Sequence, residues 1–175
     1  GLAGAVCMLL YPLLKYNALG DLDILMTFAF LPTIGTSYAI TGMIDWSVLY
    51  IALPVGLITD GILHANNTRD MNTDKRAGIV TMAMCMGKKS AAWLYAFEVT
   101  FPYIWILACV IMGVFAWPTV LVLLTVPMAI KCAKTMLKGY QDINAIAMLD
   151  MQAAQLQMAF SVVLSIALVV SKFIA

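Results

Sequence analysis

The stretch "WSVLYIALPVGLITDGILHANNTRDMNTDKRAG", residues 46–78, joins a long apolar run to a dense polar segment. Between Trp46 and His64 the only Asp, Glu, Lys or Arg is Asp60, and this run has the length of about 20 residues that a helix needs to cross a bilayer. Amides, carboxylates and cations then follow within a few residues of one another. The stretch therefore predicts a transmembrane helix whose last turns carry polar groups out of the lipid.

The composition of the whole chain supports a membrane protein. Of its 175 residues, 63% are hydrophobic and 11% are charged, and the mean hydropathy is +0.96. These values indicate an integral membrane protein that lies in a lipid bilayer. A net charge of +1 provides no broad basic surface, so we expect no nucleic-acid partner.

The apolar runs predict an all-α fold, a polytopic transmembrane helical bundle. They are too long for barrel strands, and backbone groups in lipid must form their hydrogen bonds within the chain. Five full spans and one partial N-terminal span are expected, at about 1–14, 22–43, 46–64, 90–115, 118–134 and 152–172. Polar links follow the first, third and fifth of these spans, and tight turns follow the second and fourth.

The cations fall on one side of this topology. Nine of the ten Lys and Arg residues lie in or beside the polar links, and only Lys172 lies on the other side. Lys and Arg in short loops mark the cytoplasmic face of a membrane. We therefore expect the polar links, and any site that they form, to face the cytoplasm.

The polar segment forms a stripe if the third span continues as a helix beyond the hydrocarbon. At about 100° per residue, one third of the helix circumference then carries Asp60, His64, Asn67, Asp70 and Asp74. Asp70 and Asp74, four residues apart, repel each other unless a cation lies between them. Two carboxylates with the Asn67 carbonyl nearby suit Mg²⁺, which substrate phosphates commonly complete. The cations expected beside such phosphates are Lys15, Arg69, Lys75 and Arg76.

Other interpretations of these residues stay open. The polar segment is equally consistent with a solvated helix cap in which Arg69 pairs with Asp70 or Asp74. Ionisable groups at membrane depth indicate function by default. Alternatively, Asp60 only forms a hydrogen bond with His64 one turn further on, and Glu98 only pairs with a residue of a neighbouring helix. A secondary transporter whose ion path uses these three residues is the alternative from another class.

Several stretches resemble one family, the UbiA-type intramembrane prenyltransferases. "NNTRDMNTDKRAG" followed by "TMAMCMGKKSA" is similar to the family's second aspartate-rich motif and the segment after it. "YPLLKYNALGD", "GTSYAITG" and "AAQLQMAFSVVLSIAL" resemble, in the same order, the link before the fifth helix, the end of that helix and the last helix. The branch most similar is the 1,4-dihydroxy-2-naphthoate polyprenyltransferases of menaquinone biosynthesis.

The resemblance implies a Mg²⁺-dependent transferase that moves a polyprenyl group from polyprenyl diphosphate to an aromatic acceptor. The expected acceptor is 1,4-dihydroxy-2-naphthoate, and 4-hydroxybenzoate is the alternative. Such enzymes have nine helices, so residues 1–175 would supply the C-terminal part of one domain, from the end of the fourth helix to the ninth. The implied location is a bacterial inner membrane, with the site on its cytoplasmic face.

The resemblance also implies roles for individual residues. Asp70 and Asp74 match the family's metal-binding aspartates, while Asn66, Asn67 and Arg69 match the polar residues that lead into them. Asn67 is expected to join the metal site, and Asn66 and Arg69 are expected to bind the diphosphate. Lys15 matches a basic residue that faces the diphosphate, and Lys75 can replace a cation that relatives carry after the motif. No side chain is assigned a catalytic role. The family's first aspartate-rich motif is not among these 175 residues, so we expect this chain alone to be inactive.

Overall fold

The computed structural model describes Val6, Leu9 and residues 20–174. The part of the chain within these limits is almost entirely helical and contains no strand, which confirms the all-α fold. Lys15 lies outside the described residues, as does the expected partial span at 1–14 except for Val6 and Leu9.

Five helical segments are long and apolar enough to cross a membrane, as expected: Gly20–Thr41, Trp46–Arg76, Lys88–Ile111, Trp117–Gly139 and Leu149–Ile174. The first comprises α2 (Gly20–Ile24), a π-helical segment (Leu25–Phe30) and α3 (Leu31–Thr41). The second is a 3-10 turn (Trp46–Val48) followed by α4 (Leu49–Arg76), and the short α5 (Met82–Met86) leads to α6 (Lys88–Ile111). The fourth joins a 3-10 segment (Trp117–Thr125) to α7 (Val126–Gly139), and the last is α8 (Leu149–Ile174).

Two helix ends differ from the sequence expectation. The span expected to end at residue 64 continues to Arg76, because hydropathy marks where a helix leaves lipid and not where its backbone hydrogen bonds stop. The span expected over 90–115 ends at Ile111 instead. Gly113, with a φ of +73°, adopts the left-handed conformation that commonly follows a helix C-terminus.

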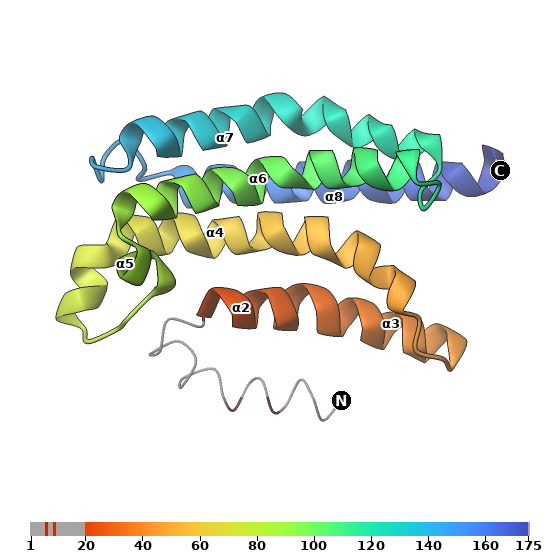
Figure 1. Ribbon diagram of the computed structural model, residues 1–175, viewed down its shortest axis with the longest axis horizontal. Helices are drawn as coiled ribbons and strands as arrows, with labels where there is room; N and C mark the ends of the chain where they lie inside the picture. The colour runs from red at the N-terminus through yellow and green to blue at the C-terminus, as the bar shows by residue number, and fades with distance from the viewer. Residues whose placement is uncertain (1–5, 7–8, 10–19, 175) are drawn as a thin grey trace.

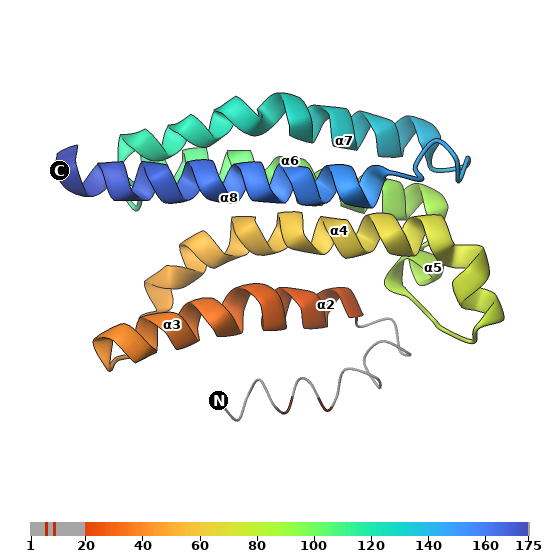
Figure 2. The same ribbon diagram turned by 180° about the vertical axis from the view of Figure 1, so that it is seen from behind.

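α4 lies in the middle of the bundle. Both views show α2 and α3 along one side of α4 and the helices α6, α7 and α8 on its other side (Figures 1 and 2). The larger group packs around fully buried side chains such as Ile58 of α4, Tyr95 of α6 and Phe160 of α8. By contrast, α3 buries none of its residues, so the first span lies at the edge of this bundle.

The contact between the first span and α4 depends on a glycine. A Cβ added at Gly56 would lie 2.6 Å from the Ala29 Cβ and 2.6 Å from Leu25 Cδ1, both in the π-helical segment. Only a residue without a side chain permits this close approach of the two backbones. Gly56 therefore allows the π-helical segment to lie close to α4.

The cations gather at one end of the molecule. The last turns of α4, the start of α6 and the last turns of α7 all lie at that end, whereas the C-terminus of α8 with Lys172 lies at the other (Figure 1). Lys131, Lys134 and Lys138 belong to this end, as do Lys75, Arg76, Lys88 and Lys89. We refer to it below as the cationic end.

Candidate functional site

The polar stripe of α4 becomes more exposed toward the cationic end. Asp60 and His64 are buried, with 7% and 0% of their surface exposed. Asn67, Asp70 and Asp74 are half-buried. Because α4 stays helical through Arg76, the condition on which the stripe depended is met. The stripe thus runs from the protein interior to the cationic end.

Arg69 ties this stripe to α8. Its Nε donates to Asp70 Oδ1 at 2.9 Å, and its Nη2 donates to Asp70 Oδ2 at 3.0 Å. Its Nη1 donates to Asp150 Oδ2 at 2.7 Å and to the Ala147 carbonyl at 3.1 Å. Nη2 also donates to Asn66 Oδ1. A guanidinium has five N–H donors, and all five are used here.

This network bears on both interpretations of the polar segment. Arg69 pairs with Asp70, as the helix-cap interpretation expected. Each carboxylate oxygen has two lone pairs, so Asp70 keeps acceptor capacity for a metal ion. Arg69, however, can bind a diphosphate only by giving up one of its present partners. In this arrangement it positions Asp70 and Asn66.

Two acidic residues that the sequence did not single out lie beside the stripe. Asp21 and Asp23 of α2 are buried, with 2% and 5% of their surface exposed. Asn67 Nδ2 donates to Asp21 Oδ1 at 3.1 Å, which leaves the Asn67 carbonyl available as an acceptor. Asp21 Oδ2 and Asp23 Oδ1 are buried without a hydrogen-bond partner among the described residues. An unsatisfied buried carboxylate oxygen is costly and indicates a missing ligand, water or side chain.

A second polar group lies one to two turns deeper in the bundle. His64 Nδ1 of α4 lies 3.2 Å from Glu98 Oε1 of α6, and both residues are almost fully buried. Asp60 is close enough to Glu98 and Asp21 to interact with both electrostatically. His64 Nε2, Asp60 Oδ1 and Glu98 Oε2 have no hydrogen-bond partner within the described part of the chain. The structure thus brings together the three residues that were candidates at membrane depth.

A mostly apolar slot reaches the candidate site from the lipid-embedded region. It has a volume of about 320 Å³ and lies between α2, the π-helical segment, α4 and the first turn of α8; its lining residues are Ile24, Phe28, Thr59, Ile62, Leu63, Asn66 and Asp150. Its two most polar residues, Asn66 and Asp150, are both bonded to Arg69. The slot therefore joins an apolar region to the polar network around Asp70.

The remaining predicted residues are not gathered in the same way. Lys75 is exposed near the end of α4, and Asp74 is half-buried with a partner of its own. Among the described residues, no three His, Cys, Asp or Glu side chains are grouped to hold a metal ion. The oxygen donors present suit Mg²⁺, and the unpartnered Asp21 oxygen beside Asn67 fits such a ligand set. These residues nevertheless supply only part of a coordination shell.

Comparison with known proteins agrees with the family resemblance. Residues 1–170 match the model of the UbiA prenyltransferase family. The "UbiA prenyltransferase domain-containing protein 1" of Gallus gallus is 42% identical over 115 residues, which cover 66% of this chain and 34% of that protein. The Homo sapiens protein of the same name is 46% identical over 91 residues, covering 51% of this chain and 27% of that protein.

A relative from Drosophila melanogaster, "UbiA prenyltransferase domain-containing protein 1 homolog", is 45% identical over 89 residues, or 51% of this chain and 25% of that protein. The matched part of the chain thus spans between a quarter and about a third of each of these relatives. Since the family model matches nearly the whole chain, the chain belongs to the UbiA prenyltransferase family.

Proposed function

We propose that the protein containing this chain transfers a polyprenyl group from polyprenyl diphosphate to an aromatic acceptor within the membrane. The observation that carries the proposal is the slot, which is apolar along Ile24, Phe28, Ile62 and Leu63 and ends at the network of Arg69, Asn66 and Asp150. A polyprenyl diphosphate has the same polarity pattern, with a long apolar chain and a charged head. Family membership supports the same reaction.

Mg²⁺ is proposed to bind Asp70 and Asp74, with the Asn67 carbonyl nearby. When bound, Mg²⁺ neutralises the diphosphate charge and makes diphosphate a better leaving group. Arg69 and Asn66 hold the Asp70 side of this site, and Lys75 and Lys15 supply positive charge for the phosphates. We propose that the other metal ligands come from an aspartate-rich motif preceding these residues, which would make residues 1–175 the fourth to ninth helices of nine.

The proposed acceptor is 1,4-dihydroxy-2-naphthoate, as in menaquinone biosynthesis, and 4-hydroxybenzoate is the competing acceptor. The relatives' names specify no acceptor. Direct competition between the two compounds in one assay decides between them.

We propose that the candidate site faces the cytoplasm, because the cationic end carries all described Lys and Arg residues except Lys172. The three relatives reported above come from animals, so the bacterial inner membrane expected from the menaquinone branch stays a prediction. Accessibility of a cysteine introduced at Lys75, probed from either side of sealed vesicles, tests the orientation.

The reaction is tested with the full-length protein, Mg²⁺, a polyprenyl diphosphate and dihydroxynaphthoate. Prenylated product is expected from the wild type, and Asp70→Ala or Asp74→Ala should lower turnover by more than about 100-fold. Asp142→Ala is the matched control, because Asp142 is exposed in the loop before α8 and its carboxylate accepts a hydrogen bond from the nearby Asn144 N–H. Unchanged turnover in both α4 variants would overturn the metal assignment.

A further inference from the structure

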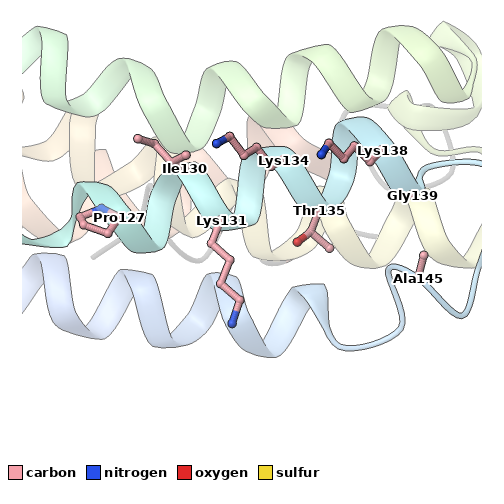
Figure 3. Close-up of a pocket in the computed structure, with 8 residues that line it drawn as sticks. All are labelled: Pro127, Ile130, Lys131, Lys134, Thr135, Lys138, Gly139 and Ala145. Atoms are coloured by element: carbon pink, nitrogen blue, oxygen red, sulfur yellow. The ribbon is translucent and has the colours of Figure 1, made fainter.

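The outer face of α7 carries a groove that has no part in the proposed prenyl transfer. It has a volume of about 580 Å³ and is lined by Pro127, Ile130, Lys131, Lys134, Thr135, Lys138, Gly139 and Ala145 (Figure 3). All of these except Ala145 belong to α7. None of the eight is acidic and three are lysines, so the groove is strongly cationic. We refer to it as the α7 lysine groove.

The three lysines are all exposed on α7, which is an amphipathic helix. Ala129, Cys132, Ala133 and Met136 are buried in the bundle. In Figure 3, Lys131 points toward the α8 side of α7, while Lys134 and Lys138 lie on the other side of the helix axis. Like charges this close along one helix repel one another. An anion in the groove would relieve that repulsion.

Along the fourth span, the exposed large side chains that precede the lysines are apolar. Leu121 and Leu124 are 43% and 73% exposed in the 3-10 segment, and Ile130 is 42% exposed at the near end of the groove. Lys131 follows directly. It precedes the end of the span at Gly139 by eight residues, or about 12 Å of helix. A lysine at that depth extends its amine toward the lipid headgroups.

Apolar residues followed by lysines favour one kind of ligand for the α7 lysine groove. A free phosphate would use the lysines but not the apolar residues beside them. A second copy of the chain would need an acidic surface, whereas the described acids are mostly buried or paired, as are Asp21, Asp60, Glu98 and Asp150. A lipid with an anionic phosphate matches both parts, because basic pockets at the headgroup level of transmembrane helices attract such lipids.

We propose that the α7 lysine groove binds the phosphate headgroup of an anionic phospholipid, whose acyl chain lies along Leu121 and Leu124. Lys131 and Lys134, which both line the groove, supply the positive charge that attracts the phosphate. Lys138 adds charge nearer the water. The site lies on α7 and is separate from the polar stripe of α4, so its occupancy can be measured without prenyl transfer.

The experiment measures binding of phosphatidylglycerol to the full-length protein in mixed micelles with phosphatidylcholine, by native mass spectrometry. The double variant Lys131→Gln and Lys134→Gln is expected to weaken phosphatidylglycerol binding by roughly 30-fold relative to phosphatidylcholine. Lys88→Gln with Lys89→Gln is the matched control, because it removes the same charge at the same end of the molecule but outside the groove. The control should bind phosphatidylglycerol as the wild type does.

Three further measurements test the lipid assignment. Lys131→Arg with Lys134→Arg should restore binding, and an unchanged unfolding temperature in phosphatidylcholine alone shows that the Gln variant is folded. Glycerol 3-phosphate, a headgroup without chains, should compete poorly; equal competition would mean an anion site and overturn the lipid assignment. Equal loss in the Lys88/Lys89 control, or a dimer that disappears in the groove variant, would also overturn the proposal.

Discussion

Arg69 of α4 and Asp150 at the start of α8 form an ion pair of 2.7 Å across 81 residues of sequence. The same guanidinium binds both oxygens of Asp70. The position of Asp70 is therefore coupled to the start of α8, which lies beyond the α7–α8 loop. A substitution at Asp150 should therefore alter the position of Asp70, the candidate metal ligand, through Arg69.

Arg69→Lys should lower prenyl transfer by about 10–100-fold, because a lysine keeps the charge but cannot form the bidentate contact with Asp70. If Arg69 positions Asp70, the variant will need more Mg²⁺ for half-maximal activity. A raised KM for polyprenyl diphosphate at an unchanged Mg²⁺ requirement would instead mean that Arg69 binds the diphosphate itself. Asp150→Asn should shift the Mg²⁺ requirement in the same direction, and Asp142→Asn should leave it unchanged.

Leu63→Trp should obstruct the apolar slot, because Leu63 lines the slot and indole is much larger than an isobutyl group. The KM for a long polyprenyl diphosphate is expected to rise about tenfold, which corresponds to about 1.4 kcal/mol. Leu57→Trp is the control, since Leu57 is half-buried on the same helix but is not among the residues lining the slot. Equal KM values for the two variants would argue against the slot as the prenyl site.

His64→Ala or Glu98→Ala should each destabilise the protein by about 3 kcal/mol, because each leaves a buried polar partner uncompensated. The double variant His64→Leu with Glu98→Leu should cost less than the sum of the two single variants. Unfolding by denaturant in detergent micelles measures this difference. The double variant also separates structure from function: normal turnover in folded protein would make the pair purely structural, and lost turnover would give it a role in the reaction.

Gly56→Ala should destabilise the packing of the first span on α4 by about 1–3 kcal/mol, because its Cβ would overlap Ala29 and Leu25. Gly35→Ala is a matched control within a helix, because a Cβ at Gly35 meets nothing within 4 Å. Thermal unfolding of the two variants measures the difference. Equal midpoints would show that α2 and α3 adjust to the added methyl group without cost.

The membrane spans were predictable because their signal is local. Apolar length alone gives each of the five crossings, and helical periodicity alone places Asp60, His64 and Asp70 on one stripe of α4. The helix ends were less predictable, as Arg76 shows, because a polar sequence continues a helix as readily as an apolar one when its backbone hydrogen bonds continue.

The partners of the stripe were not predictable in the same way. Asn67 and Asp21 are 46 residues apart, and their contact requires the first span to pack against α4. From the sequence, Asp21 and Asp23 resemble ordinary acidic residues in the first turn of a helix, where the helix dipole favours them. Only the packing shows that both are buried.

The length of α4 has a consequence for the membrane around it. Its 28 residues extend for about 42 Å, whereas the hydrocarbon core of a bilayer is about 30 Å thick. Counted from Leu49, Asn66 lies at about 26 Å and Asp74 at about 38 Å along the helix. If one edge of the hydrocarbon lies at Leu49, the other edge falls within the candidate site. Turnover should then depend on bilayer thickness, because we expect a thin membrane to leave Asn66 and Asp70 hydrated and a thick membrane to desolvate them. Turnover in vesicles of stepped acyl-chain length should accordingly pass through an optimum.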